Sequence, residues 1–180
     1  FNSVGGTYKN LNYYSYFQYK TGNGFRPNSH YDVYTGFIGG TIKISQRISV
    51  TAEYTYMDYV TQQPGGLNYT SFLRNPAQSS RTRNWFAVNW NMASIKLDYK
   101  IDENNTINIR NFGFIGDRLA LMDSLSFSNP RFLERNDETD KNRTLIADYY
   151  KNIGSEGRYL KKYNLFKNKS SFLVGYRAYY

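Results

Sequence analysis

The chain contains no cysteine and a single histidine, His30, among its 180 residues. The absence of cysteine excludes a disulfide scaffold and a thiol nucleophile, and one histidine leaves little for a histidine-based metal cluster. We therefore expect neither a metal site nor another cofactor. No apolar run approaches the roughly 20 residues of a membrane helix, and the N-terminal segment FNSVGGTYKN lacks the charged-then-apolar pattern of a signal peptide.

The composition favours strands over helices. Aromatic residues make up 18% of the chain, with 19 Tyr and 12 Phe, and aromatic side chains are enriched in strands. A net charge of +9 indicates an anionic partner without naming it. The mean hydropathy of -0.68 is compatible with a membrane β-barrel, because only every second residue of a barrel strand faces lipid. We treat residues 1–180 as a single region.

Alternating hydrophobicity identifies the strands. Between 48 and 56 the even positions are apolar and the odd positions polar, and the last segment repeats the pattern except at Leu173. The same test predicts seven strands, at 8–20, 31–44, 47–59, 82–101, 105–116, 143–165 and 171–180. In 82–101 the apolar residues change parity, from which we predict a bulge near 91–94. The long strand 143–165 contains Gly154 and Gly157, from which we predict that it bends or extends beyond the membrane on the loop side.

The connections between these strands alternate in length. Short polar turns (SQR, DENN and FKNKS) alternate with TGNGFRPNSH, a loop of about 22 residues after strand 47–59, and one of about 26 residues at 117–142. Short turns on one side and long loops on the other are typical of an antiparallel outer-membrane β-barrel. Bacterial single-chain barrels have an even number of strands, and both end strands are predicted to run towards the long loops. Seven strands therefore predict part of a larger barrel. The alternative is a complete eight-stranded barrel with a further strand in FNSVGGTY.

Several motifs resemble TonB-dependent outer-membrane receptors: Arg26-Pro27-Asn28-Ser29, Gln62-Gln63-Pro64-Gly65-Gly66-Leu67 and Arg83-Asn84-Trp85-Phe86. The similarity extends from about residue 13 to 180 and is closest to the ferric dicitrate receptor branch of Bacteroidetes-type bacteria. The resemblance implies a 22-stranded barrel around a plug domain, importing an iron chelate in the bacterial outer membrane with energy relayed by TonB. The other partners it implies are the plug and the remaining barrel strands, neither of which these residues contain.

The candidate ligand-binding residues lie in the predicted loops or, for Arg83, at the start of the strand that follows. No carboxylate occurs between Asp58 and Asp98, so arginines there would attract an anionic chelate and offer it forked donors. Glutamine side chains could add neutral hydrogen bonds. The full set is Arg26, Gln62, Gln63, Arg74, Arg81 and Arg83. The alternative is that the arginines bind lipopolysaccharide phosphates or keep the loop soluble. We interpret Pro64-Gly65-Gly66 as a turn-forming segment rather than as a ligand contact.

Other residues have simpler interpretations. We interpret Tyr54, Tyr56, Tyr59, Trp85 and Trp90 as an aromatic girdle rather than a ligand site, and Lys43, Glu53, Lys96 and Asp98 as residues of a polar lumen. The pair His30 and Asp32 is too weak a signal for catalysis, because residues i and i+2 of any strand share a face. We therefore expect no enzyme, and no nucleic-acid partner. Two other functions stay open: a small barrel acting as an adhesin or structural protein, and a soluble all-β binding module.

Overall fold

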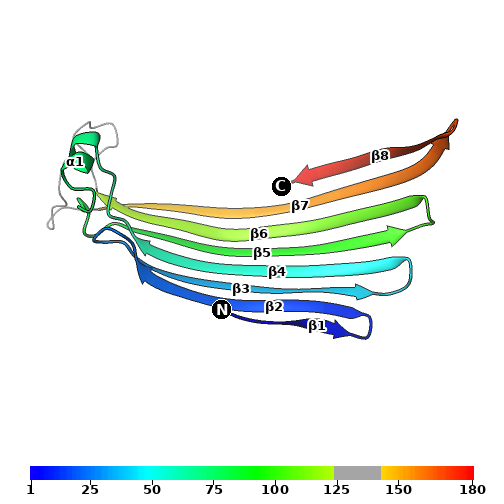
Figure 1. Cartoon of the computed structure of the whole chain (residues 1–180), viewed down its shortest axis with the longest axis horizontal. Coiled ribbons are helices and arrows are strands. Elements are labelled where there is room, and N and C mark those ends of the chain that lie inside the picture. The colour runs from blue at the N-terminus through cyan, green and yellow to red at the C-terminus, as the bar shows by residue number, and fades with distance from the viewer. Residues whose placement is uncertain (124–142) are drawn as a thin grey trace.

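The computed structural model describes residues 1–123 and 143–180. Within them, eight antiparallel strands form one open sheet in chain order (Figure 1). The strands are β1 (Asn2–Tyr8), β2 (Leu11–Asn23), β3 (His30–Lys43), β4 (Ile48–Gln62), β5 (Trp85–Lys100), β6 (Asn105–Asp123), β7 (Arg143–Leu165) and β8 (Asn168–Tyr179). The all-β antiparallel prediction is confirmed, but the number seven is wrong. The additional strand, β1, lies in FNSVGGTY and pairs with β2 along its whole length.

The turns and loops separate to opposite ends of the sheet (Figure 1). Turns at 9–10, 44–47, 101–104 and 166–167 join the strands at one end, the short-turn end. The connections 24–29 and 63–84, the second of which contains helix α1 (Tyr69–Arg74), lie at the other, the loop end. Most of the predicted 117–142 loop lies outside the described residues. The first predicted strand, 8–20, corresponds to β2 and runs towards the long loops as expected, whereas the additional strand β1 precedes it and runs into the turn at 9–10. No helix in the described ranges has the length and apolar character needed to cross a membrane.

The two faces of the sheet differ in chemistry. Directly paired residues of neighbouring strands share a face, so the register from β2 to β7 assigns every strand residue. One face, here called the apolar face, carries along its middle Phe17, Ile38, Val50, Tyr54, Ile95, Ile109 and Ile153. The opposite or charged face carries Lys43, Glu53, Lys96, Asp98, Arg110, Glu156 and Arg158. Such a sheet separates an apolar from a polar environment.

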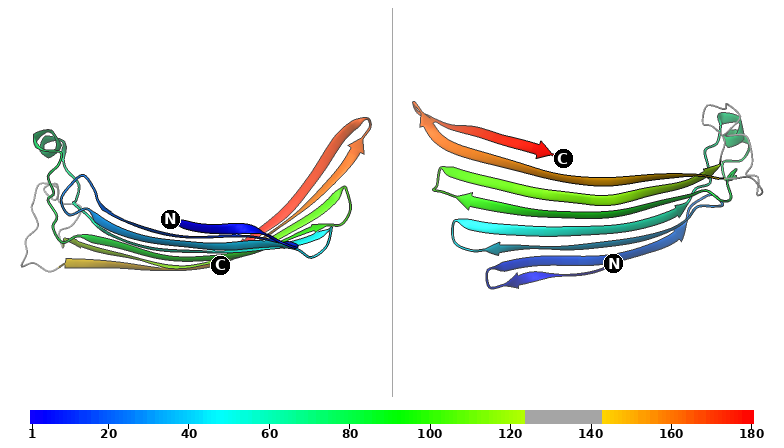
Figure 2. Two further views of the ribbon diagram at one scale, coloured as in Figure 1. Left: turned by 60° about the horizontal axis from the view of Figure 1, so that its bottom comes forward. Right: turned by 180° about the vertical axis from the view of Figure 1, so that it is seen from behind.

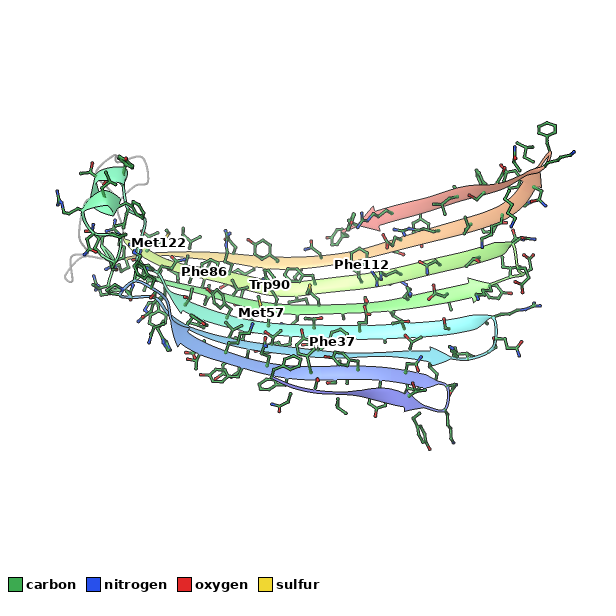
Figure 3. The ribbon with its side chains drawn as sticks, in the orientation of Figure 1. Phe37, Met57, Phe86, Trp90, Phe112 and Met122 are labelled. Atoms are coloured by element: carbon green, nitrogen blue, oxygen red, sulfur yellow. The ribbon has the colours of Figure 1, made fainter. Side chains whose placement is uncertain are left out.

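In strand β5 the apolar residues change from even to odd positions, and the register of the strand explains the change. Its pairing with β4 and with β6 is uninterrupted from Trp85 to Lys100, so the predicted bulge near 91–94 is wrong. Near the loop end the apolar residues, such as Phe86 and Trp90, lie on the charged face, whereas near the short-turn end Ile95 and Leu97 lie on the apolar face. The parity change therefore marks an apolar area on the otherwise charged face (Figure 3).

Strand β7 curves away from the plane of the other strands at the short-turn end (Figure 2). Gly154 lies in the middle of β7 between two aromatic rings, Phe112 of β6 and Tyr179 of β8, whose centroids are 5.7 Å apart in an edge-to-face arrangement. A β-carbon at position 154 would overlap the Phe112 ring. The glycine thus lets the two rings meet across the strand, and the predicted bend is confirmed.

Candidate ligand-binding site at the loop end of the sheet

At the loop end, the side chain of Arg26 connects two loops. Its guanidinium donates to the carbonyl oxygens of Gln78 at 2.7 Å, Gly65 at 2.6 Å and Pro64 at 3.1 Å. Asn28 adds a bond from its amide nitrogen to the carbonyl of Gln63 at 3.0 Å. Partial burial of the guanidinium lowers the pKa of Arg26 from its ordinary value, yet the group stays charged at any physiological pH. The 24–29 loop is therefore fastened to the 63–84 loop.

A second feature of the loop end is the buried guanidinium of Arg81. This side chain is only 1% exposed and donates to the carbonyl of Ser80 at 2.9 Å. It packs against Gly65, whose φ of +77° is one that L residues rarely adopt; a β-carbon there would lie 2.6 Å from Cγ of Arg81. The Pro64-Gly65-Gly66 segment thus makes a turn that accommodates Arg81, consistent with its interpretation as turn chemistry.

Helix α1 begins at a regular N-cap. The side chain of Asn68 accepts a hydrogen bond from the amide of Ser71 at 2.7 Å, and the amide nitrogen of Gln78 donates to the Ser71 carbonyl at 2.6 Å. Arg74 lies in the last turn, where a cation is favourable for the helix dipole. Its side chain is exposed and makes no hydrogen bond or ion pair with any residue the structure describes. Arg74 can therefore meet an incoming anion directly.

Gln62 and His30 point to the apolar face rather than the charged face. The side-chain oxygen of Gln62 accepts from the backbone amide of His30 at 3.2 Å. The His30 ring lies 3.0 Å from the side-chain oxygen of Asn23 and 3.2 Å from a carboxylate oxygen of Asp32. Among the described residues, no group of three or more His, Cys, Asp or Glu could hold a metal. These side chains form a polar network that fixes the end of the sheet.

A hollow of about 520 Å³ lies on the charged face, close to the loop end. It is lined by Met57, Tyr59, Phe86, Val88, Trp90, Phe114, Arg118 and Tyr150. The rings meet edge to face: Tyr59 and Phe86 have centroids 6.3 Å apart, and Trp90 and Phe114 are 6.0 Å apart. Figure 3 labels three of these lining residues, Met57, Phe86 and Trp90. The arrangement offers flat apolar walls to a ligand.

Arg118 is the one charged residue that lines the hollow. Its guanidinium forms an ion pair with Asp148 of β7, and its Nε donates to the same carboxylate at 2.9 Å. The Arg118 side chain is 48% exposed, so its remaining donors face solvent. The hollow therefore combines aromatic walls with a positioned guanidinium at the edge.

The structure brings three of the six predicted ligand-binding residues together. Arg26, Gln63 and Arg81 meet in the fastened loops, Gln62 points to the apolar face and Arg74 lies on α1. Arg83 is half-buried and takes part in interactions of its own. Ligand contact by these residues stays a prediction. The sequence reasoning missed the aromatic hollow, although the parity change in 82–101 was its signal.

The aromatic residues predicted as a girdle divide between the two faces. Tyr54, Tyr56 and Trp85 lie on the apolar face, and Tyr59 and Trp90 lie in the hollow on the charged face. The predicted lumen residues do share one face. There, Lys96 pairs with Asp98 at 3.0 Å and Arg110 with Glu53 at 3.7 Å.

Comparison with known proteins identifies the fold. No protein-family model and no curated protein sequence matches the chain. Among solved structures, the unliganded ferric citrate transporter FecA matches 98% of this chain with a TM-score of 0.83 and 21% identity. The sheet has the fold of a segment of a TonB-dependent receptor barrel. The open form of the ferric-catecholate import receptor Fiu from E. coli K12 matches 96% of the chain, with a TM-score of 0.69 and 11% identity.

The chain spans only part of the length of the proteins it matches. It covers 25% of the FecA chain and 30% of the Fiu chain. Both are transport proteins, and the predicted resemblance to the receptor barrel is confirmed at the level of fold. The ferric dicitrate branch and the Bacteroidetes-type source stay predictions.

Proposed function

We propose that this chain is part of the barrel wall of a TonB-dependent receptor in the bacterial outer membrane, and that the receptor imports an anionic iron chelate such as ferric citrate. The observation that carries the proposal is the match of nearly the whole sheet to a receptor barrel. Supporting observations are one apolar face, strands mostly longer than the 9–11 residues that a bilayer needs, and long loops gathered at one end. The remaining strands, the plug and TonB would be its partners.

Loop charge supports an anionic ligand. The 63–84 loop carries Arg74, Arg81 and Arg83 and no carboxylate. Because Arg81 is buried against Gly65, ligand capture rests chiefly on Arg74 and Arg83. Arg81 and Arg26 instead hold the loop in the conformation that presents them.

The test is uptake of radioactive iron by cells that carry the full-length receptor. The double variant Arg74→Gln/Arg83→Gln is compared with Lys9→Gln/Arg47→Gln, which removes the same charge from turns at the opposite end. We expect the loop variant to take up ferric citrate several-fold more slowly at low salt, with the difference shrinking as salt rises. Equal uptake by both variants at every salt concentration would show that the arginines do not capture the ligand.

The aromatic hollow favours a second candidate substrate, a chelate that carries flat aromatic rings, such as a ferric catecholate. Ring-lined walls would stack on such groups, and the guanidinium of Arg118 would complement their negative charge. Uptake of ferric citrate and of a ferric catecholate by the same cells separates the two candidates. The preferred chelate competes with the other, and lack of uptake of both would contradict the proposal of iron import.

A further inference from the structure

The hairpin of β7 and β8 differs from the other turns in length and charge. The last β7 residue that pairs directly with β6 is Lys161, opposite Asn105, and β7 continues to Leu165 beyond it. The hairpin therefore overhangs the neighbouring turn, as Figure 1 shows at the end opposite to α1. Between Glu156 and Tyr180 the chain has six cations and no carboxylate. The positive charge of this overhanging hairpin favours an anionic binding partner.

The register shows which lysines share the apolar face. Lys161 pairs with Phe172, and both lie on the apolar face with Tyr159, Tyr163 and Val174. Lys162 and Lys169 lie on the charged face, while Lys167 is in the turn itself. The apolar band thus ends in a lysine and a tyrosine before the tip of the hairpin. Lysine and tyrosine after an apolar band are typical of the membrane interface.

The tip adds an apolar anchor. Phe166 is 94% exposed and has a φ of 56°. It stands next to Lys167, and the side chains of Lys161 and Lys167 form no ion pair or hydrogen bond with any residue in the described ranges. The carboxylates of the neighbouring turn are Asp102 and Glu103. Asp102 accepts hydrogen bonds from the backbone amides of Asn104 and Asn105. An exposed ring beside unpaired lysines suits an anionic lipid surface.

We propose that Lys161, Lys167 and Phe166 form a binding site for the headgroup of an anionic phospholipid in the leaflet at the short-turn end. The lysines would hold the phosphate while Tyr163 and Phe172 contact the acyl chains. The inference rests on the proposed membrane location of the barrel. It does not depend on which ligand is imported. An acidic segment of a second protein is the competing occupant, and it would have no reason to prefer the apolar face.

The test is native mass spectrometry of the full-length receptor, purified in detergent and supplied with phosphatidylglycerol or phosphatidylcholine. Lys161→Gln/Lys167→Gln is compared with Lys162→Gln/Lys169→Gln, a matched pair from the same hairpin. Since each lysine near an anionic surface is worth roughly fivefold in binding, we expect the first pair to lose about tenfold or more of bound phosphatidylglycerol. The second pair should retain most of it. Phosphatidylcholine should bind all forms equally.

Two outcomes overturn the site. Equal loss in both pairs would mean diffuse attraction by the whole basic hairpin, and no loss in the first pair would mean that lipid does not bind there. Phe166→Asn supplies an independent check, because asparagine tolerates the left-handed backbone but lacks the ring. It should weaken phosphatidylglycerol binding without changing folding, as measured by heat-modifiable mobility. Normal iron uptake in these variants would leave the proposed transport function intact.

Discussion

The guanidinium of Arg26 donates to the carbonyl oxygen of Gly65 at 2.6 Å, across 39 residues of sequence. Two further carbonyls of the same loop accept from this side chain. By donating to three backbone carbonyls, this side chain holds the 24–29 loop against the 63–84 loop. We infer that the conformation of the 63–84 loop, which carries Arg74, depends on these bonds. Removing a charged donor from such acceptors costs about 1–3 kcal/mol.

We expect Arg26→Gln to loosen the 63–84 loop without affecting the sheet. Limited proteolysis of the full-length protein should cleave this loop several times faster than in the wild type. Arg26→Lys should not restore protection, because an ammonium lacks the planar fork that reaches three carbonyls. Arg74→Gln is the matched control, since Arg74 fastens nothing among the described residues. A cleavage rate unchanged in Arg26→Gln would contradict the fastening role.

Gly65→Ala should destabilise the same loop by about 1–2 kcal/mol, because its φ of +77° is costly for any residue with a β-carbon. The new methyl would also press on Arg81. Hydrogen exchange of the 63–84 amides measures the effect. Gly36→Ala is the control, since a β-carbon at position 36 meets no atom within 4 Å. Equal exchange in the two variants would show that the turn tolerates the methyl group.

Trp90→Ala should weaken binding of an aromatic chelate roughly two- to tenfold, since an aromatic contact is worth about 0.5–1.5 kcal/mol beyond its buried area. Phe37→Ala removes a ring from the same face at a position outside the hollow and should have no effect. Quenching of intrinsic fluorescence during titration with the chelate gives the affinity of Phe37→Ala and of the wild type. Because Trp90→Ala removes one of the two tryptophans, its affinity for the chelate is measured by isothermal titration calorimetry. If the two variants bind alike, the hollow is not the ligand site.

The turn at 101–104 should become less stable in acid. Hydrogen bonds from the amide of Asn104 and the side chain of Asn105 lower the pKa of Asp102 below its ordinary 3.8. Because the folded pKa lies below the unfolded one, the stabilisation is complete above 3.8 and is lost as the pH falls through the folded pKa. Asp102→Asn should therefore melt below the wild type at neutral pH, and the gap should close below about pH 3.8. A gap that stays constant from neutral pH to pH 3 would contradict the assignment.

The sequence predicted the strands well because period-2 alternation is a local signal. It anticipated β4, β7 and the separation of short turns from long loops to within a few residues. It gave β1 only as an alternative, a further strand in FNSVGGTY, because Gly5 and Gly6 interrupt the apolar pattern there and pairing with β2 supplies the order instead. Pairing between strands is a property of the sheet, and a local pattern does not contain it.

The site was harder to predict for the same reason. The parity change in β5 was visible, but only the uninterrupted register distinguishes a bulge from an apolar area on the charged face. The role of Arg26 depends on a contact across 39 residues, and burial of Arg81 depends on the turn at Gly65. Charge in the sequence selected the candidate arginines, and contacts between the loops determine the surroundings of Arg26 and Arg81.

The central claim is that the apolar face meets lipid while the opposite face meets water inside a barrel. The chain has no cysteine, so spin labels can be placed on β4 at Thr51→Cys and Ala52→Cys, neighbours that lie on opposite faces. We expect collisions in outer membranes with apolar oxygen to dominate at 52 and those with a water-soluble nickel chelate to dominate at 51. If the nickel chelate reaches both labels equally, the sheet does not line a membrane, and both the import proposal and the lipid site fail with it.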